Sequence, residues 1–178
     1  MKILKLSTVF LLLGGLLAFR MAGIEFETKI LLGNKIELKI PKGFVSMSDD
    51  MAKLKYPSGR RPTLVYTNET STISVALNLT SDRATQAQLP VISENLLHTY
   101  RHQYMGAHEK WNALKDVNGR KVGFIEFGTL GAVTGVYSLI FFTDVRGQLL
   151  LCTVNCTDKD TEKWKLVAKE MMASLKVK

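Results

Sequence analysis

The chain has 178 residues, 46% hydrophobic and 22% charged, which suits a single globular domain with a full core. Its 24 Lys and Arg residues against 16 Asp and Glu give a formal net charge of +8. The positive charges are scattered singly and the aromatic residues fit apolar stripes, so the composition argues against a nucleic-acid-binding face.

The N-terminus combines positive charge with an uncharged apolar stretch. Lys2 and Lys5 precede Leu6–Phe19, which is 14 residues long. A membrane-spanning helix needs about 20 apolar residues, whereas the apolar part of a secretory signal needs about 7–15. We therefore expect residues 1–20 to be an export signal or, if uncleaved, a short anchor that holds the protein at a membrane. The single domain is then expected to cover 24–178.

Two other interpretations of this segment stay open. It could form a buried N-terminal helix, or Met21 could be the working start, so that the mature protein lacks the first twenty residues. Only Ala18 supplies a small residue at the expected cleavage site. The region contains no cysteine, which excludes the lipid anchor of a bacterial lipoprotein.

The first half of the body predicts strands with one short helix. Apolar and charged residues alternate strictly in Lys35–Ile40, as in a strand with one buried face. Ser48 or Asp49 could cap a short helix that contains Met51 and Leu54. The other strands expected here are Ile24–Leu32, Leu64–Thr67 and Thr72–Leu79.

A long helix is predicted next. Pro90 suits its first turn, and Gly106 suits its end. Apolar residues recur between them at the helical spacing, and they are Ile92, Leu96, Leu97, Tyr100 and Tyr104.

The last third predicts four strands and a final helix. Asn118-Gly119 is a strong hairpin signal, because both central positions of the favoured two-residue turn need a positive φ. The final helix runs over Asp158–Leu175, with apolar residues three or four apart. The four strands are Trp111–Lys115, Lys121–Phe127, Val136–Thr143 and Gln148–Asn155. This order predicts an α+β fold in which helices sandwich a mostly antiparallel sheet.

No motif nominates a catalytic residue, a cofactor-binding residue or a metal site, and we expect no cofactor. His98 and His102 share one helix face, and a metal site there could take Glu94 or His108 as a third ligand. A zincin requires Glu directly after its first His, and this chain has Thr99 at that position. A solvated helix face is the simpler interpretation. The glycine-rich run Gly128–Gly135 has neither Rossmann nor P-loop spacing and fits a strand connection better than a ligand-contacting loop.

The two cysteines, Cys152 and Cys156, fall at the end of one predicted strand. In an extended chain they would stand about 13 Å apart, whereas a disulfide needs Cα atoms within about 7 Å. We expect two buried thiols, and a disulfide only if the chain turns sharply at Asn155.

The segment Lys35–Phe44, with its Ile40-Pro41-Lys42-Gly43-Phe44 turn, resembles the opening strand of PsbP-like domains. The run Val136–Phe142, Gly147–Val154 and Trp164–Leu175 resembles the ending of their bacterial DcrB branch, related to the Eag chaperones of type VI secretion. The resemblance implies a PsbP-like α/β/α sandwich and a non-enzymatic role in binding or assembly. DcrB-like proteins usually carry a lipobox cysteine, which this chain lacks.

Three functional hypotheses follow. The first is an exported protein of the bacterial cell envelope or periplasm that binds a partner protein and catalyses nothing. The second is a cytoplasmic Eag-type chaperone that shields the transmembrane segments of type VI effectors by holding an apolar helix. The third is a metal-dependent hydrolase using the two helix histidines. The sequence leaves the oligomeric state open, and the residues that could serve either the core or a partner interface are Tyr66, Ile73, Val75 and Phe124.

Overall fold

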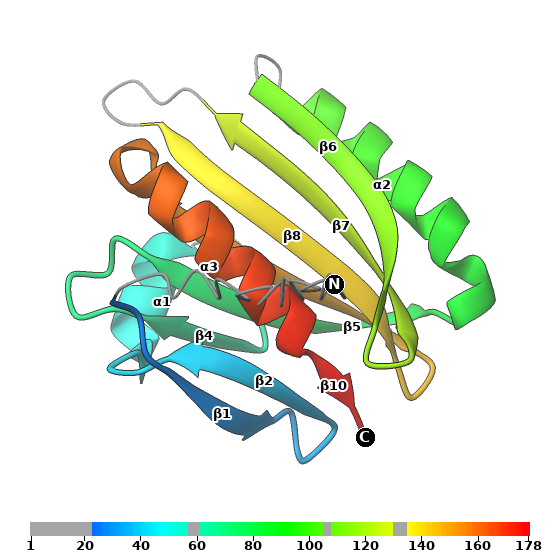
Figure 1. Cartoon of the computed structure of the whole chain (residues 1–178), viewed down its shortest axis with the longest axis horizontal. Coiled ribbons are helices and arrows are strands. Elements are labelled where there is room, and N and C mark those ends of the chain that lie inside the picture. The colour runs from blue at the N-terminus through cyan, green and yellow to red at the C-terminus, as the bar shows by residue number, and fades with distance from the viewer. Residues whose placement is uncertain (1–22, 57–60, 105–107, 130–134) are drawn as a thin grey trace, which may run out of the picture.

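The computed structural model describes residues 23–56, 61–104, 108–129 and 135–178, and omits the side chains of 108–111. The described strands form two antiparallel sheets (Figure 1). The larger has the order β3-β4-β5-β9-β8-β7-β6 and the smaller the order β1-β2-β10. This confirms the α+β prediction with a mostly antiparallel sheet.

The bounds of the elements are as follows. The large sheet contains β3 (Val45–Ser46), β4 (Leu64–Thr67), β5 (Ser74–Arg83), β6 (His108–Val117), β7 (Arg120–Thr129), β8 (Val136–Val145) and β9 (Gln148–Thr157). The small sheet contains β1 (Phe26–Leu31), β2 (Ile36–Pro41) and β10 (Lys176–Val177). The helices are α1 (Asp49–Lys55), α2 (Leu89–Gln103) and α3 (Thr161–Ser174), with 3-10 turns at Gln86–Gln88 and Asp158–Asp160.

The two faces of the large sheet are covered differently. One face, here the closed face, lies under α3 and the small sheet, and α3 crosses it in the foreground of Figure 1. The other, here the open face, carries α1 at one end and α2 at the other. Successive side chains of a strand point to opposite faces, so each central strand contributes to both.

The closed face holds the main core. Apolar residues from the large sheet, from β2 and from α3 form one cluster, in which Leu38, Phe141 and Met171 are fully buried. The predicted stripe of α3 is buried throughout, and it comprises Trp164, Val167, Ala168, Met171 and Leu175. Each such side chain contributes about 1.5–3 kcal/mol when fully buried.

Local sequence signals place the turns where they were expected. Asn118 and Gly119 have φ of 48° and 79°, as the hairpin turn requires. Arg146 and Gly147 do the same between β8 and β9, with φ of 51° and 82°. Ser48 caps α1 by accepting a hydrogen bond from the Met51 amide at 3.4 Å.

The small sheet is the part of the architecture that the sequence pattern did not predict. The alternation in β2 correctly predicts one buried face, on which Ile36, Leu38 and Ile40 are fully buried. That alternation shows that a strand has a buried face but not which sheet the strand joins. The third strand, β10, has two residues, which is too short for any periodic signal.

A polar anchor fixes the start of α2. The Gln86 side chain donates to Asp144 at 2.5 Å and accepts a hydrogen bond from the Lys121 amide at 2.7 Å. Arg120 also pairs with Asp144, at 2.6 Å. The turn that leads into α2 is therefore tied to both β7 and β8, which sets where the helix lies on the open face.

The predicted export signal or anchor falls on residues 1–22, which lie outside the described residues. Among the ranges that the structure describes, none of the helices combines the length and the apolar content needed to cross a membrane.

Candidate binding groove

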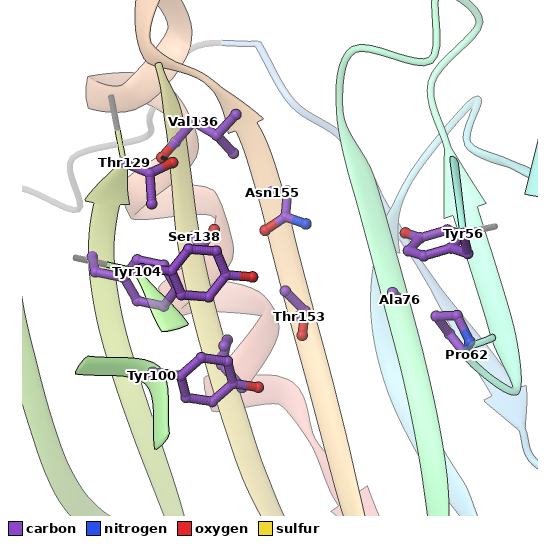
Figure 2. A pocket seen from close by; sticks show the side chains of 12 residues that line it. Tyr56, Pro62, Ala76, Tyr100, Tyr104, Thr129, Val136, Ser138, Thr153 and Asn155 are labelled. Atoms are coloured by element: carbon purple, nitrogen blue, oxygen red, sulfur yellow. Dashed lines mark hydrogen bonds between the residues drawn. The ribbon is translucent and has the colours of Figure 1, made fainter. Parts of the chain in front are cut away.

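A groove runs along the open face between α1 and α2 (Figure 2). Its volume is about 340 Å³, which lies at the lower end of the range of small-molecule pockets. Strands β5, β9, β8 and β7 supply the floor, and aromatic side chains stand on both sides. The lining residues are Tyr56, Pro62, Ala76, Tyr100, Tyr104, Phe127, Thr129, Val136, Ser138, Ile140, Thr153 and Asn155.

The α2 side is an aromatic wall. Tyr100 and Tyr104 are one helical turn apart, and their rings stack with centroids 6.0 Å apart and planes 14° apart. Both rings pack against Phe127 of β7, at 5.8 and 5.2 Å. These contacts position the two phenol rings along the groove and leave Tyr104 36% exposed at its rim.

The α1 side is built from Tyr56 and Pro62. The helix packs on a small cluster of Met47, Val65 and Ala76. Tyr56 follows the last turn, where its amide donates to the carbonyl of Ala52 at 2.8 Å. Its ring therefore stands opposite the α2 tyrosines, across the floor strands (Figure 2).

A row of polar side chains crosses the open face and reaches the floor of the groove at Asn155 and Ser138. The sheet register places Thr67 opposite Ser74, Ser74 opposite Asn155, and Asn155 opposite Ser138. We call these four residues the polar row. The next row towards α2 is Ala76, Thr153 and Ile140, again in direct register. Polar groups thus occupy a part of the sheet that lies between two apolar clusters.

Two members of the polar row have partners within the fold. The Thr67 hydroxyl donates to the carbonyl of Ile73 at 2.8 Å. Ser74 lies within hydrogen-bonding reach of the Tyr56 hydroxyl. Asn155 differs, because its Oδ1 is buried and no described group donates to it.

Among the described residues that line the groove there is no Lys, Arg, Asp or Glu, although the chain as a whole is basic. Burial raises the pKa of Tyr56, and the hydrogen bond with Ser74 only partly offsets this. Burial, with a smaller contribution from Tyr104, likewise raises the pKa of Tyr100. Both phenols are therefore uncharged near neutral pH and can donate and accept hydrogen bonds. The lining groups suit recognition of an uncharged surface.

The four residues expected at a partner interface lie elsewhere. Val75, Phe124 and Ile73 are buried in the main core of the closed face. Tyr66 is partly buried against the same core, with the Lys29 ammonium 5.3 Å from its ring centroid. Their role in partner binding stays a prediction, and their position under α3 and the small sheet favours the core alternative.

The candidate metal and thiol residues are placed as follows. His98 and His102 are exposed on α2, with Nε2 atoms 3.2 Å apart. The described residues contain no group of three or more potential ligands that could hold a metal ion, and the His108 side chain lies outside them. Cys152 and Cys156 are free and buried, which confirms the expectation of two buried thiols. Burial raises the pKa of both, for Cys156 to about 12.

Sequence reasoning missed the groove residues for an identifiable reason. The polar row comes from four strands, and in each strand its residue belongs to the half of the alternating pattern that reads as solvated. Only the pairing of Tyr100 and Tyr104 on one helix stripe hinted at an aromatic surface.

Comparison with known proteins shows similarity at the level of structure. No family model and no curated protein sequence matches the chain. The solution structure of cyanobacterial PsbP (CyanoP) from Synechocystis superposes with a TM-score of 0.62 at 16% identity, covering 89% of this chain and 96% of that one.

Two crystal structures are also similar. LpqN, involved in cell envelope biogenesis of Mycobacterium tuberculosis, superposes with a TM-score of 0.53 at 12% identity, covering 86% of this chain and 91% of that one. PA94 of Pseudomonas aeruginosa, a protein of unknown function and putative regulator, has a TM-score of 0.46 at 14% identity, covering 86% and 97%. The TM-scores of CyanoP and LpqN show a shared fold, and the low identities leave function to be argued from the site. The chain therefore has a PsbP-like α+β fold.

Proposed function

We propose that the protein is an exported, non-enzymatic component of the bacterial cell envelope that binds a partner protein through the groove. The observation that carries this proposal is the groove itself, which lies between α1 and α2, has aromatic side chains on both walls and has no charged side chain among its described lining residues. Tyrosines are favoured at protein interfaces because they bury a large apolar ring and keep a polar tip.

Two further observations support the location. Lys2, Lys5 and Leu6–Phe19 have the pattern of an export signal. LpqN, which shares the fold, is described as acting in cell envelope biogenesis. The lining of the groove offers hydroxyl, amide and aromatic groups, which recognise a surface without supplying an acid–base pair.

A cytoplasmic chaperone of the Eag type is the second candidate. The neutrality of the groove favours it, because an apolar transmembrane helix fits an uncharged lining. A start at Met21 would suit this candidate, since it removes the apolar N-terminal segment.

Localisation separates the two candidates. The experiment is the intact mass of the protein from fractionated native cells. A chain in the envelope fraction, either lacking about twenty N-terminal residues or uncleaved in the membrane, supports the exported protein. A cytoplasmic chain that begins at Met21 rejects export and leaves the chaperone.

Groove binding is tested with a filling substitution. Thr153 is a partly exposed floor residue, so Thr153→Trp should block the groove without opening the core. Thr80→Trp is the matched control, on the same face but outside the lining. We expect a partner that co-purifies with the wild type and with Thr80→Trp, and is lost with Thr153→Trp. Equal retention by both variants would show that the groove is not the binding site.

A further inference from the structure

We propose that Asn155 determines which partner the groove accepts, by hydrogen bonding one hydroxyl or amide side chain on an otherwise uncharged helix of the partner protein. This inference rests on the proposed function, because it takes the groove as the partner-binding site. It goes further by naming the secondary structure, the charge and the one polar group of the occupant.

The floor of the groove favours a helix. Asn155 and Thr153 belong to β9, which is hydrogen-bonded along its length to β5 on one side and β8 on the other. The floor is thus a sheet face, and its backbone groups are already paired. An extended segment lying on it would leave its own N–H and C=O groups without backbone partners, whereas a helix satisfies them internally.

The lining favours an uncharged occupant. A charged side chain brought into the groove would lose its water and meet no opposite charge among the lining residues that the structure describes. The rings of Tyr56, Tyr100 and Tyr104 instead offer apolar surface from both walls. The contact face of the helix should therefore consist of small and medium apolar residues.

At Asn155 the contact between the helix and the groove should be polar instead of apolar. Its Oδ1 is buried without a partner among the described residues, whereas Thr67 and Ser74 of the same polar row are already engaged. The terminal torsion of an asparagine side chain is broad and two-fold, so the carboxamide can turn to present its oxygen to the groove. Figure 2 shows the side chain in the middle of the floor, between the tyrosines of the two walls.

The groove should select a single polar group on the bound helix, because that group can pair with the Asn155 amide. If the helix places Ala or Leu over Asn155, Oδ1 stays unpaired as it is in the free protein, and no hydrogen bond is gained on binding. If it places Ser, Thr, Asn or Gln there, the amide is paired. We expect the groove to prefer the polar helix by at least ~10-fold, as for other buried groups whose partner is removed.

The test uses the full chain and a displayed library of amphipathic helices, each with one uncharged face and one randomised central position on that face. The wild type is expected to enrich hydroxyl and amide residues at this position. Asn155→Leu is expected to enrich Leu and Ala instead, with binding retained. Asn78→Leu is the matched control, because Asn78 lies on the same face of β5, outside the groove, and accepts from the Thr63 hydroxyl. It should select like the wild type.

The outcomes separate failure of this inference from failure of the proposed function. If the wild type and Asn155→Leu enrich the same apolar helices, the groove binds a helix but Asn155 does not choose it, and the inference is wrong. If the wild type enriches no helix, both the inference and groove binding are wrong. Concentration-dependent self-association that is lost in Thr153→Trp would assign the groove to a second copy of the chain, and would also overturn the inference.

Discussion

The two faces of the large sheet differ in what their side chains pack against and pair with. On the closed face, α3 and the small sheet bury a continuous apolar cluster, and even its carboxylate, Glu126, has two lysine partners. On the open face, α1 and α2 cover the two ends and leave a neutral groove between them. A buried amide oxygen is left there without a partner. The closed face is thus a continuous core, whereas the open face keeps a groove lined by aromatic and polar side chains.

This contrast is the physical basis for assigning function to the open face. Natural proteins lose stability where a binding site needs groups that the fold alone would not keep. Asn155 at the groove fits that description. On the closed face the Tyr137 hydroxyl is also buried without a hydrogen-bond partner among the described residues, but it lies within the apolar core beside Glu126, away from the groove lining.

The closed face should respond most strongly to truncation. Phe141 is fully buried in the main core, so Phe141→Ala should lower the free energy of unfolding by about 3–5 kcal/mol. Tyr104→Ala, at the rim of the groove, should change it by less than about 1 kcal/mol. Urea denaturation measures both. Comparable losses would mean that the two faces contribute equally to stability.

The buried carboxylate of the closed face gives the second effect. Glu126 is 4% exposed, and its oxygens lie 3.4 and 2.9 Å from the ammonium groups of Lys165 and Lys169 on α3. Glu126→Gln removes the negative charge that these lysines face and should cost about 1–3 kcal/mol in denaturant unfolding. The control is Glu170→Gln, which breaks the exposed pair with Lys39 and should cost at most about 1 kcal/mol. If Glu126→Gln leaves the free energy of unfolding unchanged, the ion pairs of Glu126 with α3 do not help to hold that helix on the sheet.

On the open face, a substitution should raise the free energy of unfolding instead of lowering it. Asn155→Leu replaces a buried, unpaired amide oxygen with an apolar side chain and should raise the free energy of unfolding by about 1 kcal/mol. Asn78→Leu breaks a hydrogen bond with Thr63 and should give no gain. Thermal unfolding of the two variants shows the difference. A loss of stability in Asn155→Leu would indicate that the amide has a structural partner.

The smallest effect is a pH dependence of the closed face. Burial raises the pKa of the Cys152 thiol, and it raises that of Cys156 to about 12. A raised folded-state pKa means that the thiols stabilise the fold fully below about pH 8.5, the ordinary thiol value, and that this contribution falls as the pH rises towards the folded value. Urea midpoints between pH 8 and 10 should fall more steeply for the wild type than for the double variant Cys152→Ala/Cys156→Ala. Parallel slopes would show that the thiols are not protected by burial.

The sequence predicted the elements better than their arrangement. Strand alternation, the Asn118-Gly119 turn and the α3 stripe are local patterns, and the structure confirms them. The small sheet depends on pairing between β2 and the two-residue strand β10 at the far end of the chain, which no local pattern encodes. The groove floor depends on register across β5, β9, β8 and β7. The sequence therefore showed which residues alternate but not which of the two faces is covered.

The same limit explains the interface residues proposed from sequence. Val75 and Phe124 are apolar members of alternating strands, so they fit a core or an exposed sheet face equally well. The structure places both in the main core, and residues on the opposite face of the same strands, such as Ala76 and Phe127, line the groove instead.

The central claim is that a partner contacts the open face between α1 and α2. Its most direct test is photocrosslinking in native cells from a benzoylphenylalanine placed at Tyr104, on the groove wall, or at Val91, exposed on α2 outside the groove lining. We predict a discrete protein adduct from position 104, mapped to an uncharged helical segment, and none from position 91. Adducts of equal yield from both positions, or from position 91 alone, would contradict the assignment of the groove as the binding site.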